Sequence, residues 1–245
     1  MTLYLIGLGL HTIKDVSNAA LDVLKRCDHI VFESYTSLYR STQEEIEATI
    51  GKSVMVGDRA YVEGKTDELI TMAKTKHVAL LVIGDPLIAT THTAFLLEAK
   101  QQGVQVGVFH NASVLNAVAQ TGLEIYKFGR VISIPFATRE VTAPIDHFRK
   151  NQQANLHTLF LLDLHPKDDR FMSTAQAIDY LLGHGVDENL LCVACGALAT
   201  PEQKIVSGTL KELKNYELNV YPQCLIIPDK MHFVEEEMVK SFKLE

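Results

Sequence analysis

The sequence has few cysteines, no long apolar run and no excess of basic residues. Its 245 residues include only four cysteines, too few and too scattered for a disulfide framework, so a reducing, cytoplasmic environment is expected. No apolar run approaches the ~18 residues that a membrane span needs. Lysine and arginine total 23 against 30 aspartate and glutamate, a net charge of -7 that argues against a surface for nucleic acid. The composition, 47% hydrophobic and 22% charged, predicts a folded globular protein.

In the first half of the chain, short β-branched runs alternate with helical patterns. Strands are expected at residues 3–7, 29–33, 54–56, 78–83 and 104–109. Helical spacing of apolar residues separates them, and Ser41 with Glu44 has the spacing of a capping box. This order predicts a mostly parallel sheet with right-handed crossovers, which is an α/β layer fold.

After Gly122 the pattern of strand-like and helical segments changes. Strand-like runs lie at 131–136, 156–164, 190–194 and 224–227, and helical patterns at 174–182, 209–214 and 233–242. These runs predict a second α/β domain, and without a Gly/Ser-rich linker we place the boundary near Asn111, giving domains 1–111 and 112–245. The acidic run from Glu235 to Glu237 is expected on a solvated helix face.

A glycine turn, Gly7-Leu8-Gly9, directly follows the first expected strand. Such a turn lets the backbone approach a ligand, but the third glycine of a dinucleotide fingerprint is replaced by Thr12. A ligand role and a simple tight turn therefore remain equally open, and a nicotinamide oxidoreductase is disfavoured.

Asp85 follows the most apolar expected strand, within Gly84-Asp85-Pro86. Ligands of open α/β sheets bind beyond the carboxyl ends of strands, so the carboxylate is expected at the site. An equally open interpretation is that Asp85 caps the next turn. Ser113, after another strand, is a natural helix N-cap whose helix could meet an acceptor group, although capping alone explains it more simply.

Metal and nucleophile motifs are weak. Cys192 and Cys195 have CxxC spacing but lie in an apolar strand with no second pair, which favours buried structural thiols. His157 and His165 match no metal-ligand spacing and are expected to be polar loop residues, so no metal site is predicted. Neither a G-x-S-x-G motif nor a Walker loop is present.

Six segments carry a family resemblance. They are LYLIGLGL (3–10), RCDHIVFESYTS (26–37), GDPLIATTHT (84–93), HNASVLNAV (110–118), GLEIYKFGRVISIPF (122–136) and HTLFLLDL (157–164). Together they resemble the diphthine synthase family of tetrapyrrole-methylase-like, S-adenosylmethionine-dependent methyltransferases.

The resemblance implies a two-domain α/β architecture, a homodimer, and a cofactor cleft between the domains. S-adenosylmethionine would bind there and leave as S-adenosylhomocysteine. The positions that match the family's cofactor contacts are Leu10, Asp85, Ile88, Ser113, Val114, Leu162, Leu198 and Gln223.

The chain departs from the family pattern in places. Ala194 to Leu198 stands where the family has GLARVG, and Gln223 stands where it often has histidine. A backbone contact would survive both changes, whereas a side-chain contact at Gln223 is in doubt. His11 replaces a usual glycine beside the first turn, and the stretch after Asp163 is shorter than in many relatives.

The implied substrate is elongation factor 2 carrying a 3-amino-3-carboxypropyl-histidine, which is methylated to diphthine or to diphthine methyl ester. The sulfonium already activates the methyl group, so alignment matters more than a strong base. No residue is assigned as the base that accepts the amine proton. His92 and Glu33 are candidates, but a purely structural role is at least as well favoured for each of them. Alternatives are methylation of a small tetrapyrrole, or a noncatalytic protein that retains the cofactor cleft.

Overall fold

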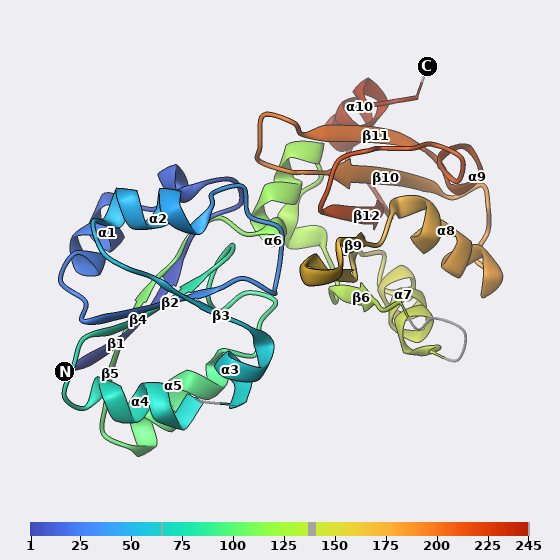
Figure 1. The fold of residues 1–245 in the computed structure, drawn as a ribbon. Coiled ribbons are helices and arrows are strands. Elements are labelled where there is room, and N and C mark those ends of the chain that lie inside the picture. The colour runs from blue at the N-terminus through green and yellow to red at the C-terminus, as the bar shows by residue number, and fades with distance from the viewer. Residues whose placement is uncertain (65, 137–140, 245) are drawn as a thin grey trace. The chain divides into compact units, whose positions relative to one another are not determined.

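The structure, a computed structural model, describes residues 1–64, 66–136 and 141–244. The chain divides into two compact units, Met1–Val114 (unit 1) and Leu115–Glu245 (unit 2) (Figure 1). Within the described ranges, no helix is both long enough and apolar enough to cross a membrane.

Unit 1 is built on a parallel sheet. Across the described residues, its strands run in the order β3-β2-β4-β1-β5, and each neighbouring pair is parallel. The strands are β1 (Thr2–Gly7), β2 (His29–Glu33), β3 (Met55–Gly57), β4 (Val78–Val82) and β5 (Gln105–Phe109). The central strand β4 is buried along its whole length, as expected for a parallel strand covered by helices on both faces. The predicted parallel α/β layer is confirmed.

Helices cover both faces of this sheet (Figure 1). One face packs against α1 (Asn18–Leu24), α2 (Gln43–Ile50) and the short turn η1 (Ile13–Asp15). The other face packs against α3 (Arg59–Gly64), α4 (Thr66–Ala73) and α5 (Thr93–Gln101). The apolar spacing that predicted these helices therefore corresponds to two separate cores, one on each side of the sheet.

The capping box of α2 lies one residue beyond the predicted position. Thr42 is the N-cap, and its hydroxyl accepts from the Glu45 N–H while the Glu45 carboxylate accepts from the Thr42 N–H. Ser41 is instead buried, and its Oγ accepts a hydrogen bond from the Ile13 N–H at 3.0 Å. The prediction that Ser41 and Glu44 form the capping box was wrong by one residue. Ser41 and Thr42 are both hydroxyl residues followed by a glutamate three positions later, so the sequence pattern fits either one.

Unit 2 contains a mainly antiparallel sheet in the order β11-β10-β12-β7-β6, taken over the described residues. The strands are β6 (Ile132–Ile134), β7 (Thr158–Leu162), β10 (Leu191–Gly196), β11 (Lys204–Thr209) and β12 (Gln223–Ile227). Only the β6-β7 pair among these is parallel. A separate hairpin joins β8 (Leu164–His165) to β9 (Arg170–Phe171).

Helices α7 (Ala143–Gln153), α8 (Thr174–Gly183) and α9 (Leu210–Leu213) supply side chains to the core of unit 2. The last helix is α10 (Phe233–Ser241), and α6 (Val114–Ala117) spans the boundary between the units. Short turns are η2 (Val118–Thr121), η3 (Ile125–Lys127) and η4 (Pro166–Asp168). The helix expected after Ser113 is thus only four residues of α-helix, followed by the 3-10 turn η2.

Candidate functional site

Three loops meet at the carboxyl edge of the unit 1 sheet. They follow β4, β1 and β5, which are neighbours in the sheet. The first two are joined by a pair of backbone hydrogen bonds, from Gly84 N to Gly9 O at 2.8 Å and from Gly9 N to Gly84 O at 3.2 Å. Both glycines have positive φ, 74° at Gly9 and 80° at Gly84, so the two turns need glycine to adopt this geometry.

Asp85 connects the loop after β4 to the loop after β5. Its carboxylate is 2% exposed and accepts from the Leu87 N–H at 2.9 Å, the Asn111 N–H at 3.1 Å and His110 Nδ1 at 2.8 Å. Within unit 1, the contacts of Asp85 are thus those expected of a residue that caps a turn. Because the carboxylate is already engaged by these donors, Asp85 shapes the edge of the site.

Asn111 connects the loop after β5 to the loop after β1. Its side-chain amide donates to Gly7 O and to Asp15 O, each at 3.0 Å, and its Oδ1 accepts from the Ala112 N–H. Asp85 and Asn111 together hold all three loops at one edge of the sheet.

The predicted cofactor positions of unit 1 lie on these loops, except Val114, which begins α6 directly after the loop that follows β5. Leu10, Ile88 and Val114 are half-buried apolar side chains, and Ser113 is buried at 4% exposure. Ile88 precedes Ala89, which has a φ of 56°, an uncommon conformation for a residue with a Cβ. Partly exposed apolar groups beside backbone turns suit a large organic ligand.

The predicted positions of unit 2 also lie together, at one end of its sheet. Gln223 begins β12, opposite Gly196 at the end of β10, and Leu162 ends β7 on the other side of β12. Leu198 lies just beyond β10, between Ala197 and Ala199, which have φ values of 48° and 61°. The antiparallel pairing thus brings three positions that are distant in sequence to one sheet edge. The sequence pattern did not predict this pairing.

The Gln223 side chain forms hydrogen bonds within unit 2. Its Oε1 accepts from the Thr174 N–H at 2.7 Å, and its Nε2 donates to Val220 O at 3.0 Å. Gln223 is 7% exposed. Its amide therefore holds the start of α8.

Glu33 and His92, the two candidates for proton transfer, form a buried pair. His92 Nε2 lies 2.7 Å from Glu33 Oε2, and the side chains are 2% and 0% exposed respectively. His92 Nδ1 lies 3.0 Å from Pro86 O and must carry a proton, because a carbonyl can only accept. One proton is therefore shared between Nε2 and Oε2, and the pair fixes the loop that contains Asp85 and Ile88.

Glu235 lies in an environment that differs from the one expected from the sequence. It was expected on a solvated helix face but is 1% exposed. Its carboxylate accepts from the Glu124 N–H at 2.8 Å, the His232 N–H at 2.7 Å, Lys127 Nζ at 2.6 Å and His157 Nε2 at 3.0 Å. Burial opposes its charge, but these four donors outweigh burial and lower the pKa of Glu235 to about 2. Its neighbours Glu236 and Glu237 are exposed, as expected.

His157 is likewise fully buried, which differs from the predicted loop position. Its Nδ1 accepts from the Asp229 N–H at 2.9 Å, so Nε2 carries the proton donated to Glu235. His165 is exposed in β8. Neither histidine belongs to a group that could hold a metal ion within the ranges that the structure describes.

The thiols agree with the sequence-based interpretation. Cys192 and Cys195 are buried and free in β10, and Cys224 is buried opposite Cys195 on β12. Burial raises the pKa of Cys192 to about 12, so this thiol is a poor nucleophile.

Comparisons with known proteins identify the class. The sequence model of the Tetrapyrrole (Corrin/Porphyrin) Methylases matches residues 2–214. The chain is 36% identical to the diphthine methyl ester synthase of Homo sapiens, over 99% of this chain and 95% of the relative. It is 35% identical to the diphthine synthase of Methanococcus maripaludis, over 97% of both chains. A crystal structure of diphthine synthase superposes with a TM-score of 0.93 at 33% identity, covering 99% of this chain and 96% of the other.

The fold is thus that of a tetrapyrrole methylase, an α/β methyltransferase. Within that class, the chain belongs to the diphthine synthase family, the methyltransferases of diphthamide biosynthesis. The resemblance stated from the sequence segments, the α/β fold class and the assignment as a methyltransferase are all confirmed.

Proposed function

We propose that the protein transfers methyl groups from S-adenosylmethionine to the 3-amino-3-carboxypropyl group of a modified histidine on elongation factor 2. The product would be diphthine or diphthine methyl ester, the compounds in the names of its relatives. The main support is likeness over nearly the full length of proteins with these names.

We infer that the predicted positions of each unit would contact bound S-adenosylmethionine. Leu10, Ile88 and Ser113 would contact it from the loops of unit 1 and Val114 from the start of α6, with Asp85 holding the loops in place. Leu162, Leu198 and Gln223 would contact it from the sheet end of unit 2. When bound, S-adenosylmethionine supplies a methyl group activated by its sulfonium centre.

The protein's own contribution is positioning. The half-buried apolar side chains would exclude water from the loop edge once the cofactor is bound, and Asp85 and Asn111 fix the spacing of the loops. The substrate amine must lose a proton for each methylation at nitrogen. The pair of Glu33 and His92 is buried and already shares its proton internally, so we assign it a positioning role and expect solvent water to accept the amine proton.

This positioning role predicts different results for two Glu33 variants. In Glu33→Gln, the amide can still donate to His92 Nε2, so the affinity for S-adenosylmethionine should stay within about threefold of the wild type. In Glu33→Ala, His92 Nε2 loses the Glu33 carboxylate and the loop holding Asp85 loosens, so affinity should fall by about tenfold or more. Isothermal titration calorimetry measures both. Equal losses in both variants would contradict positioning and favour a role for the carboxyl group itself.

We further propose that each compact unit is a domain, with the boundary near Asn111, and that the protein acts as a cytoplasmic homodimer. An exposed apolar patch supports self-association, because Ile125 and Tyr126 of η3 and Phe233, Val234 and Met238 of α10 are 40 to 79% exposed. Glu235 holds these two elements together through its contacts with Glu124 and Lys127. Light scattering during size-exclusion chromatography gives the oligomeric state, and a monomer at micromolar concentration would contradict the homodimer.

Labelled S-adenosylmethionine tests the proposed reaction. The protein should transfer label to elongation factor 2 carrying the unmethylated intermediate and leave the unmodified factor unlabelled. A panel of tetrapyrrole precursors serves as the comparison, because label in a precursor and none in the factor would overturn the proposed substrate.

A further inference from the structure

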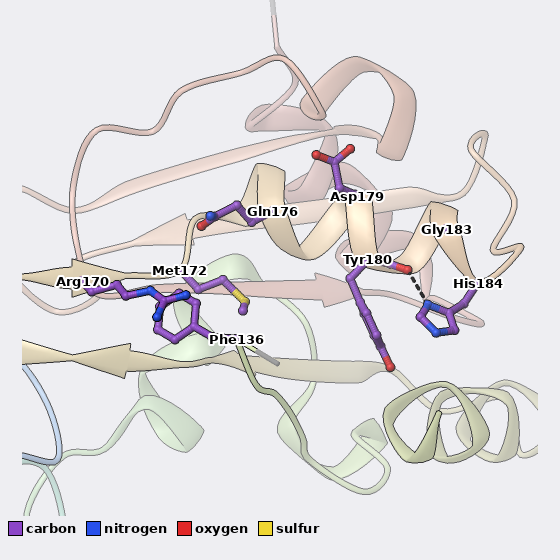
Figure 2. A pocket seen from close by; sticks show the side chains of 8 residues that line it. All are labelled: Phe136, Arg170, Met172, Gln176, Asp179, Tyr180, Gly183 and His184. Atoms are coloured by element: carbon purple, nitrogen blue, oxygen red, sulfur yellow. Dashed lines mark hydrogen bonds between the residues drawn. The ribbon is translucent and has the colours of Figure 1, made fainter. Parts of the chain in front are cut away.

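Unit 2 has a hollow that lies beside the predicted cofactor positions. Its volume is about 470 Å³, and it lies between the end of β6, strand β9 and helix α8 (Figure 2). Phe136, Arg170 and Met172 line one part, and the α8 residues Asp179 and Tyr180 with the following His184 line another. None of these residues was singled out from the sequence.

Hydrogen bonds connect the walls of the hollow to the sheet end that carries Leu162 and Gln223. The Phe136 N–H donates to Asp163 Oδ2 at 3.0 Å, and the Met172 N–H donates to Asp163 O at 2.9 Å. Asp163 directly follows Leu162 in the chain. The first residue of α8, Thr174, donates its N–H to Gln223 Oε1 at 2.7 Å. A ligand in the hollow would therefore lie beside the part of the proposed cofactor site that unit 2 provides.

Arg170 gives the hollow a fixed positive charge. Its Cζ lies 3.7 Å from the centroid of the Phe136 ring, and this ring also stacks with His165 at 5.4 Å. The guanidinium of this exposed arginine thus packs against the Phe136 ring, and its N–H groups can meet an acceptor. Among the described residues no carboxylate pairs with Arg170, whereas Asp179 is paired with Lys214 at 2.8 Å. The charge balance of the hollow therefore favours an anionic group.

Aromatic side chains line the other end of the hollow (Figure 2). The rings of Tyr180 and His184 lie 4.4 Å apart, and the Tyr180 hydroxyl is fixed by donating to Val141 O at 2.7 Å. The two rings are tilted by 51° to one another, and the face of an aromatic ring can pack against a planar group such as an imidazole. The hollow thus offers an aromatic wall at one end and a guanidinium at the other.

We propose that this hollow binds the modified histidine of the protein substrate, with the Arg170 guanidinium donating to its carboxylate in a hydrogen-bonded ion pair. The assignment rests on the proposed function, and it adds a residue that selects the substrate side chain. A planar imidazole bearing a carboxylate on a short arm matches the aromatic wall and the guanidinium together. The carboxylate also distinguishes the intermediate from an unmodified histidine, which lacks it.

The test uses Arg170→Met, which keeps an apolar cover over Phe136 and removes the charge. The matched control is Arg149→Met, because Arg149 is an exposed arginine on α7 that does not line the hollow. With elongation factor 2 carrying the intermediate, Arg170→Met should raise KM by about ten- to a hundredfold. Its kcat, its melting temperature and its affinity for S-adenosylmethionine should match those of the control. Arg170→Lys should recover part of the loss, since lysine keeps the charge without the planar fork.

The results of this experiment distinguish the role of Arg170 from the proposed methyl-transfer reaction. Methyl transfer by wild type and by Arg170→Met with equal KM would overturn the role of Arg170 and leave the proposed reaction standing. A parallel fall in cofactor affinity or melting temperature would also overturn it, because the residue would then be structural. Absence of transfer by the wild type, with cofactor binding intact, would overturn the proposed reaction and the substrate pocket with it.

Discussion

Replacing Glu235 by alanine is expected to lower the free energy of unfolding of unit 2 by about 3 kcal/mol. The variant removes the one carboxylate that accepts from two backbone N–H groups, from Lys127 and from His157. Lys127 can turn to solvent and to Glu124, 2.8 Å away, but His157 is fully buried and is left without an acceptor. Urea unfolding measures the loss, followed by circular dichroism because the chain has no tryptophan.

Glu236→Ala is the matched control for this variant. Glu236 is the next residue of α10, is about half exposed and lies 4.0 Å from Lys240, so its loss should change stability by less than about 0.5 kcal/mol. Equal effects of the two substitutions would contradict the buried position of Glu235.

The Glu235 carboxylate also makes the stability of the folded protein depend on pH. Its pKa is lowered from 4.5 to about 2 in the folded chain, so its contribution is present above pH 4.5 and is lost as pH falls toward 2. The difference in stability between the wild type and Glu235→Gln should therefore shrink as pH falls from about 5 to about 3. A difference that stays constant over this range would show that Glu235 is not ionised at its hydrogen-bonded position.

Gly7→Ala is expected to abolish most methyl transfer and to weaken cofactor binding by more than about tenfold, through crowding where the loops meet. A Cβ at Gly7 would lie 2.6 Å from the Gly84 carbonyl oxygen, 2.9 Å from Asn111 Cβ and 3.1 Å from Pro86 Cδ. A backbone oxygen cannot rotate away, so the loops after β1, β4 and β5 must separate. These loops carry Leu10, Ile88 and Ser113.

The control for Gly7→Ala is Gly64→Ala in α3 of the same unit. Among the residues that the structure describes, leaving aside the backbone of the same helix, no atom lies within 4 Å of the place that a Cβ at Gly64 would take, so this variant should bind the cofactor like the wild type and be as stable or slightly more so. Calorimetry and a transfer assay compare the two. Normal cofactor affinity in Gly7→Ala would contradict a site at this edge of the sheet.

The unit 1 sheet was largely predictable from sequence because each of its strands has a local signal. β4 is apolar on both faces, β2 was predicted with its observed bounds, and Gly103 ends α5 with a φ of 70°. Parallel strands also end at one sheet edge, so residues that follow strands, such as Asp85 and Ser113, could be grouped from the order of strands and helices alone.

The prediction was weaker where structure depends on contacts between distant residues. Glu235 lies in a run of three glutamates, and its burial follows from donors more than 70 residues away, at Glu124, Lys127 and His157. Leu162, Leu198 and Gln223 meet only because β12 pairs between β10 and β7. Sequence patterns indicate which face of a helix or strand is apolar, but they do not predict the order of strands in a mixed sheet.

The mass of elongation factor 2 after reaction tests the central claim most directly. Factor carrying the unmethylated intermediate would be incubated with the protein and S-adenosylmethionine, and the modified peptide would be weighed by mass spectrometry. The peptide should gain the mass of a whole number of methyl groups, and that number distinguishes diphthine from its methyl ester. An unchanged peptide mass, in a preparation that the Methanococcus maripaludis diphthine synthase does methylate, would contradict the proposed function.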